Sequence, residues 1–125
     1  MTSSSPRAEQ ALEAGRAAVR AALEALDSGR PAVEGELAAG VRLGLRALEA
    51  KAPGRAVEVR VPPWGAVQAV AGATHTRGTP RAVVETDPVT WVLLAGGRLG
   101  FADAVRDGRV RASGERSDLG HLLPL

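Results

Sequence analysis

The sequence contains no cysteine, no tyrosine and three aromatic rings in all, and these shortages exclude several kinds of chemistry. Without cysteine the chain has no disulfide, no thiolate metal site and no cysteine nucleophile, which fits the reducing cytoplasm. Aromatic residues make up 2% of the 125 residues and hydrophobic residues 45%, so the core must consist mainly of Ala, Val and Leu. We expect the three rings, Trp64, Trp91 and Phe101, to anchor that core.

Long hydrophobic runs are also missing. No window approaches 18 uncharged apolar residues, and the first ten residues, MTSSSPRAEQ, have no apolar segment. We therefore expect neither a signal peptide nor a transmembrane helix. The 16 basic residues are 15 Arg and one Lys, against 14 acidic residues, for a net charge of +2. The preference for Arg, Ala and Gly is typical of a high-GC bacterial genome. Since no basic run or interleaved aromatic residue occurs, we expect no nucleic-acid partner.

Helical signals dominate the first 51 residues. Residues 1–5 are predicted to be a disordered tip, and the pair Ser5-Pro6 is typical of a helix start. The spacing of apolar residues predicts one helix over 6–27 and a second over about 31–50. In the second helix Gly40 and Gly44 lie four residues apart, so they would let a neighbouring backbone approach closely.

At Arg55 the apolar period changes from 3.6 residues to two, which indicates strands. Asp87-Pro88 is a second helix-start signal, and Gly96-Gly97 is a helix stop. Strands are predicted over residues 55–61, 65–71, 81–86 and 109–113, and helices over 88–95 and 101–106. A last helical turn is predicted to carry Leu119, Leu122 and Leu123.

This order of elements predicts an α+β fold. We expect a twisted, mainly antiparallel sheet of four to five strands, covered by helices and preceded by the two N-terminal helices. No linker is long enough to divide the chain. Residues 6–125 are therefore predicted to form a single domain, with a helical part over 6–51 and the sheet with its covering helices over 52–125.

Glu58 and Arg60 are polar residues on one face of the first predicted strand, and Gln68 is expected across from them. If that face meets solvent, they form an ordinary cross-strand charge pair. If helices cover that face, they form a polar site within an apolar pocket. The sequence leaves both alternatives open.

The loop around His75 and Arg77 has the donors to hold a carboxylate or phosphate, but it could equally be a solvated turn. His75 could act as a base or contact an anion, or it could hydrogen-bond within its own loop. His121 is expected to be structural or exposed. The two histidines have no metal-ligand spacing, and the sequence has no phosphate-binding loop and no Gly-x-Ser-x-Gly. We therefore predict no metal, cofactor or catalytic residue, and an enzyme using His75 with Glu58 or Arg77 is the weakest alternative.

The stretch from Thr86 to Leu125, TDPVTWVLLAGGRLGFADAVRDGRVRASGERSDLGHLLPL, resembles the C-terminal half of the sterol carrier protein family. Together with APGRAVEVRVPPWGAVQAVAGATHTRGTPRAVVE before it, the chain is similar to the compact bacterial sterol-carrier orthologues over about residues 52–125. The resemblance implies a sterol-carrier-like domain whose helices and sheet enclose an apolar tunnel for an acyl or sterol-like ligand, with no chemistry of its own. This sequence has four convincing strands where five are usual.

On this interpretation a lipid-like ligand lies between helix 88–95, helix 101–106 and the sheet. The candidate apolar lining is Val57, Val59, Val61, Val67, Val89, Val92, Leu93, Leu99, Phe101 and Val105. The candidate contacts to a polar head group are Glu58, Arg60, His75 and Arg77. Two alternatives stay open at this point. The apolar residues could simply fill a core, and the protein could be an interaction or accessory module, for example a homodimer.

Overall fold

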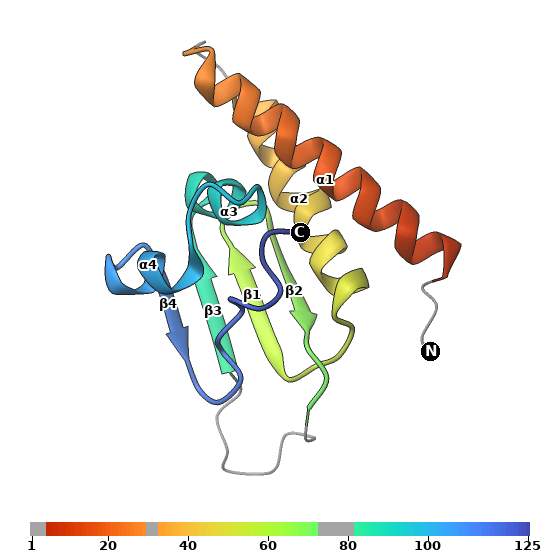
Figure 1. Ribbon diagram of the computed structural model, residues 1–125, viewed down its shortest axis with the longest axis vertical. Helices are drawn as coiled ribbons and strands as arrows, with labels where there is room; N and C mark the ends of the chain where they lie inside the picture. Colours follow the sequence, from red (N-terminus) through yellow and green to blue (C-terminus); the bar gives the residue numbers. More distant parts are fainter. Residues whose placement is uncertain (1–4, 30–32, 73–81) are drawn as a thin grey trace.

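The computed structural model describes residues 5–29, 33–72 and 82–125, and in these ranges it is an α+β fold of four helices and a four-stranded sheet (Figure 1). The elements follow the chain in the order α1 (Pro6–Asp27), α2 (Glu34–Lys51), β1 (Val57–Val61), β2 (Gly65–Ala69), β3 (Ala82–Thr86), α3 (Pro88–Ala95), α4 (Phe101–Arg106) and β4 (Val110–Ser113). The predicted fold class is confirmed.

Two helix starts lie at the predicted residues because a side chain caps each of them. The Ser5 hydroxyl accepts a hydrogen bond from the N–H of Ala8 at 3.0 Å, and the Asp87 carboxylate accepts one from the N–H of Thr90 at 3.1 Å. Each cap satisfies a backbone donor that the first helical turn leaves without a partner, and a proline follows it. The starts of α1 and α3 are therefore as predicted, and α4 also spans its predicted range although no side chain caps its first turn.

The sheet is mixed, with the strand order β2-β1-β3-β4. β1 pairs antiparallel with β2, to which a short connection joins it, and β3 pairs antiparallel with β4, in agreement with the expected mainly antiparallel sheet. The central pair, β1 and β3, is parallel. That pairing was not predicted, because strand periodicity carries no information about which distant strand becomes the neighbour.

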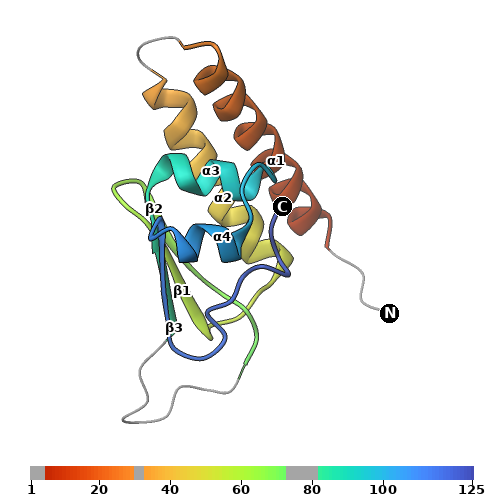
Figure 2. The ribbon, with the colours of Figure 1, turned by 60° about the vertical axis from the view of Figure 1, so that its left-hand side comes forward.

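In the described ranges all the helices lie on one face of the sheet, and no described element covers the other face, which we call the uncovered face (Figure 2). Side chains alternate accordingly along β1. Val57, Val59 and Val61 are fully buried against the helices, whereas the side chains of Glu58 and Arg60 point to the uncovered face and are 26% and 45% exposed. This settles which way Glu58 and Arg60 face.

Helix α2 lies close to α3 at Gly40 and Gly44. The indole N–H of the buried Trp91 donates to the carbonyl of Gly40 at 3.2 Å. A Cβ atom at Gly44 would lie 2.8 Å from the indole nitrogen of Trp91, and one at Gly40 would lie 3.0 Å from Val92. The small residues therefore allow the close approach that their spacing predicted.

The C-terminal segment closes the helical layer without forming a helix. The predicted helical turn is wrong in part: one backbone hydrogen bond joins Leu122 to Leu119, and no further helical bond follows within the described segment. The ammonium group of Lys51 donates to the carbonyls of Leu122 and Pro124 at 2.7 and 3.1 Å, and Leu119 is fully buried. Tertiary contacts thus replace the helical hydrogen bonds.

Gly44→Ala should lower the free energy of unfolding by about 1–3 kcal/mol, because the added methyl group meets a buried ring that has no room to move. The matched control is Gly35→Ala in the same helix, where an added Cβ has no atom within 4 Å. That control should leave the stability unchanged or raise it by up to ~1 kcal/mol. Urea unfolding measures both. Equal stabilities for the two variants would contradict the close packing of α2 on α3.

Candidate functional site

The ten residues predicted to line an apolar cavity divide into a buried set and a surface set. Fully or almost fully buried are Val57, Val59, Val61, Val92 and Phe101. Half-buried are Val67, Val89, Leu93 and Leu99, and Val105 is 38% exposed. The buried set belongs to one continuous hydrophobic core, against which four of the remaining residues pack. The described residues thus combine a continuous buried core with apolar side chains that solvent reaches.

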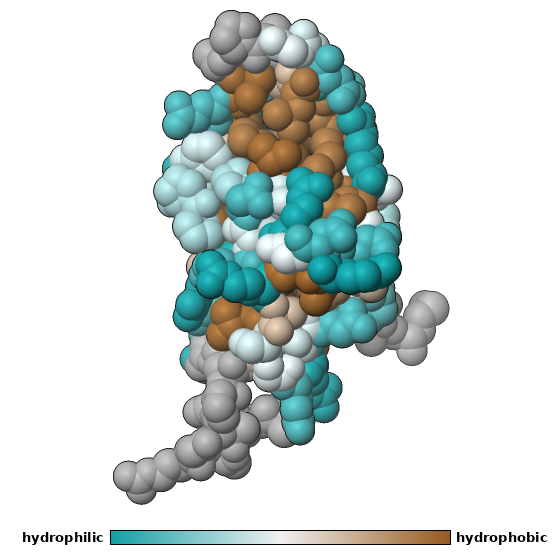
Figure 3. Space-filling view, turned by 90° about the vertical axis from the view of Figure 1, so that its left-hand side faces the viewer, coloured by the Kyte–Doolittle hydropathy of each residue, from teal (hydrophilic) through white to brown (hydrophobic). Residues whose placement is uncertain are grey.

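Helix α3 presents an apolar stripe at the surface. Val89 and Leu93 lie four residues apart, so both point to the same side of the helix, and both are half-buried. We call these two residues the α3 stripe. The space-filling view shows an apolar area on this side of the molecule, over α3 and the neighbouring ends of α1 and α2 (Figure 3). An exposed apolar area of this kind is typical of a surface that binds another molecule.

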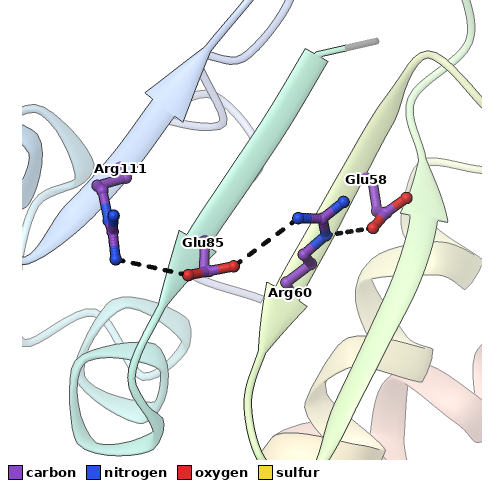
Figure 4. Close-up of polar contacts among 4 residues, drawn as sticks. All are labelled: Glu58, Arg60, Glu85 and Arg111. Atoms are coloured by element: carbon purple, nitrogen blue, oxygen red, sulfur yellow. Dashed lines mark hydrogen bonds and ion pairs between the residues drawn. The ribbon is translucent and has the colours of Figure 1, made fainter.

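The uncovered face of the sheet carries a row of charges. Arg60 contacts Glu58 on the same strand, and its guanidinium lies 3.9 Å from Glu85 on β3 (Figure 4). Glu85 in turn lies 3.7 Å from Arg111 on β4. The hydrogen bond with Glu58 raises the pKa of Arg60 above its usual value, and the charges of Glu58 and Glu85 add to this. Of the two alternatives for Glu58 and Arg60, the structure therefore shows the solvent-facing charge pair and not a polar site within an apolar pocket.

The sheet separates Glu58 and Arg60 from the buried apolar residues. A ligand between the helices and the sheet would therefore not reach either side chain with its head group. The other two predicted head-group residues, His75 and Arg77, lie outside the described residues. His121 is exposed.

A groove of about 310 Å³ lies where β3 ends and α3 begins. Its lining is polar, and it includes two arginines that were not among the predicted site residues: Arg109, which directly precedes β4, and Arg111 on β4. The lining residues are Pro62, Glu85, Thr86, Asp87, Gly108, Arg109 and Arg111. The alternation Arg109-Val110-Arg111 after the Asp-Gly turn was the available signal, since it places both arginines on one face of a strand.

Hydrogen bonds fix the walls of this groove. The Thr86 hydroxyl donates to the carbonyl of Arg109 at 2.7 Å, which joins β3 to the start of β4. Both oxygens of Asp87 face Thr90: one accepts from its N–H at 3.1 Å and the other from its hydroxyl at 2.6 Å. The same hydroxyl accepts from the Nε–H of Arg109 at 3.2 Å. The groove is thus built around the cap of α3.

The pKa of Asp87 lies below its ordinary value of 3.8. Burial acts to raise this pKa, but the hydrogen bonds from Thr90 and from the backbone N–H of Asp87, together with the charge of Arg109, outweigh burial. The charged carboxylate is therefore favoured in the folded protein. Among the described residues no group of three or more His, Cys, Asp or Glu side chains could hold a metal ion.

Asp87→Ala should lower the free energy of unfolding at pH 7 by about 0.5–2 kcal/mol, because the first turn of α3 loses its cap. Asp87→Asn keeps an acceptor and should cost less. Because the folded pKa is depressed, the stability due to the charge is present above about pH 3.8 and is lost as the pH falls through the lower folded value. Urea unfolding should therefore separate wild type from Asp87→Asn more at pH 7 than at pH 3. A gap of the same size at both pH values would contradict this account.

The comparison with known protein families gives one match. Residues 34–125 match the family described as bacterial SCP ortholog, so the match begins at the first residue of α2 and covers the sheet and the remaining helices. The resemblance found in the sequence therefore extends further toward the N-terminus than residue 52. No curated protein matches the chain. In the described ranges no helix is both long and apolar enough to cross a membrane. Because the family match spans most of its length, the chain belongs to the bacterial orthologue family of the sterol carrier proteins.

Proposed function

We propose that the protein binds and carries a lipid-like ligand, acyl or sterol-like, and catalyses no reaction on it. The family suggests a lipid-binding fold, and carriers of this fold are generally not catalysts. The described residues agree with this, since the charged side chains of the uncovered face are paired with one another. We propose the cytoplasm as the place of action.

The observation that carries the proposal is the α3 stripe at the surface of a sterol-carrier fold. Val89 and Leu93 remain half-buried while the opposite side of α3, with Trp91 and Val92, is fully buried. Leu99 is half-buried in the connection to α4, and Val105 on α4 is 38% exposed. An acyl chain of a few hundred daltons could cover these side chains and remove their apolar area from water, at about 25 cal/mol for each Å².

The ligand enters, on this proposal, between α3, α4 and the sheet. The partly exposed side chains at this place, Val89, Leu93 and Leu99, lie at the edge of the core, where a ligand would meet them first. Phe101 begins α4 and is 7% exposed, and it would form the inner end of the site. Val57, Val59 and Val61 would form its floor.

A second copy of the chain or another protein is the alternative occupant of the same apolar surface. The surface seen in Figure 3 supports this alternative as well, because apolar areas of this kind also occur at protein interfaces. The two alternatives predict different molecules over the α3 stripe in solution: a small apolar ligand in one case and a second protein chain in the other. A concentration-dependent mass in light scattering would favour a homodimer, whereas a monomer that takes up a small apolar molecule favours the carrier.

Leu93→Trp should fill the proposed site and weaken the binding of a dansyl-labelled fatty acid at least tenfold. Because Leu93 is half-buried, the variant should lose no more than about 1 kcal/mol of stability. The matched control is Leu12→Trp, a half-buried leucine in the N-terminal half of α1, which should bind the probe within twofold of wild type. Fluorescence titration and urea unfolding measure the two effects. Unchanged affinity of Leu93→Trp would overturn the proposed position of the site.

A further inference from the structure

Lys51 is the single lysine of the chain, and the other 15 basic side chains are arginines. It is the last residue of α2 and is exposed. Its ammonium group donates to the carbonyls of Leu122 and Pro124, at 2.7 and 3.1 Å. Two carbonyl oxygens that converge on one nitrogen suit the compact head of a lysine better than the planar fork of an arginine. The geometry therefore gives a physical reason for a lysine at this position of an arginine-rich chain.

The hydrogen bonds of Lys51 hold residues 118–125, which we call the C-terminal segment, and the chain ends beside α2 (Figure 1). One further hydrogen bond joins this segment to the rest of the described chain: the N–H of Leu125 donates to the carbonyl of Ala95 at 3.0 Å. Of the four leucines of the segment one is fully buried and three are half-buried against the core: Leu119, and Leu122, Leu123 and Leu125. Lys51 thus donates two of the three hydrogen bonds that fasten the segment.

The two carbonyls also orient the nitrogen of Lys51 for a reaction as a nucleophile. A neutral amine has two N–H donors and one lone pair, whereas the ammonium form has three donors. When both N–H groups donate to Leu122 and Pro124, the tetrahedral nitrogen directs its lone pair away from both carbonyls. Partial desolvation lowers the pKa of Lys51 below its ordinary value of 10.5, and the charge of Arg16 lowers it further. The reactive neutral form is therefore more populated than in an isolated lysine.

We propose that Lys51 is a modification site, at which an acyl thioester acylates the side-chain nitrogen and thereby releases the C-terminal segment. The lone pair attacks the thioester carbonyl carbon and the carbon–sulfur bond breaks. The proton that the nitrogen loses goes to the leaving thiolate, so the products are an amide and a thiol. The amide is uncharged and has one N–H donor, so it can serve only one of the two carbonyls. This inference does not depend on which ligand the protein carries.

The first experiment measures the reactivity of Lys51 in the full-length protein with acetyl-coenzyme A as the thioester. Mass spectrometry of peptides should show Lys51 acetylated at least threefold faster than Nα-acetyl-lysine amide, a lysine without surroundings. Arg16→Gln removes a charge that lowers the pKa of Lys51 and should slow the reaction. Arg20→Gln, one turn further along α1, is the matched control and should react like wild type. A Lys51 that reacts no faster than the free compound would overturn the modification site.

The second experiment measures the release of the C-terminal segment by hydrogen exchange. Lys51→Gln ends in an uncharged amide, as the acylated side chain does, and the N–H of Leu125 should exchange at least tenfold faster than in wild type. The N–H of the buried Val59 should keep its protection, which shows that the variant is folded. Acetylated wild type should behave like Lys51→Gln.

The matched control is Arg46→Gln, which removes the same charge from an exposed position of α2 and should leave the exchange of Leu125 unchanged. If Leu125 exchanges at the wild-type rate in both Lys51→Gln and the acetylated protein, acylation does not release the segment and the proposal is wrong. Faster exchange of Leu125 in Arg46→Gln as well would show a general effect of charge and would overturn the role of the two carbonyls.

Discussion

The contact between the indole of Trp91 and the glycines of α2 is the constraint on which the rest of the structure depends. Its N–H donates to the carbonyl of Gly40, and the ring occupies space that any side chain at Gly44 would need. With so few aromatic rings in the chain, this ring makes a large, oriented contact between the helical pair and α3, beside the two hydrogen bonds that Arg98 donates to Asp27 at the end of α1. It fixes which side of α3 is buried. Val89 and Leu93 are consequently left at the surface, and Asp87 is held at the end of β3.

The sheet then divides the molecule into two chemically different sides. Valines of β1 face the helices and build the apolar core, while Glu58, Arg60 and their partners form a solvated row on the other side. The two sides meet at the end of β3, where the polar groove lies beside the first turn of α3.

Much of the fold could be predicted from the sequence because the local signals are strong. Ser5-Pro6 and Asp87-Pro88 mark helix starts, and Val-x-Val-x-Val marks a half-buried strand. The parallel pairing of β1 with β3 could not be predicted, because it depends on contacts between distant segments. For the same reason the sequence could not show which face of the sheet Glu58 lies on. Nor could it show that Arg109 and Asp87 line the same groove. The C-terminal leucines suggested a helical turn, but the hydrogen bonds from Lys51 hold that segment in another conformation. The site remains less predictable than the fold, since strand register, and not residue type, decides which polar groups converge.

Native mass spectrometry of the freshly purified protein, compared with its denatured mass, tests the central claim most directly. The account predicts a non-covalent adduct of a few hundred daltons on the 12.8 kDa chain, lost on denaturation, and its mass would identify the class of lipid. To exclude loss of ligand during purification, the protein would also be measured after incubation with the dansyl-labelled fatty acid. A bare chain in both spectra, above all with a dimer peak beside it, would contradict lipid carriage and would assign the apolar surface of α3 to a second copy of the protein.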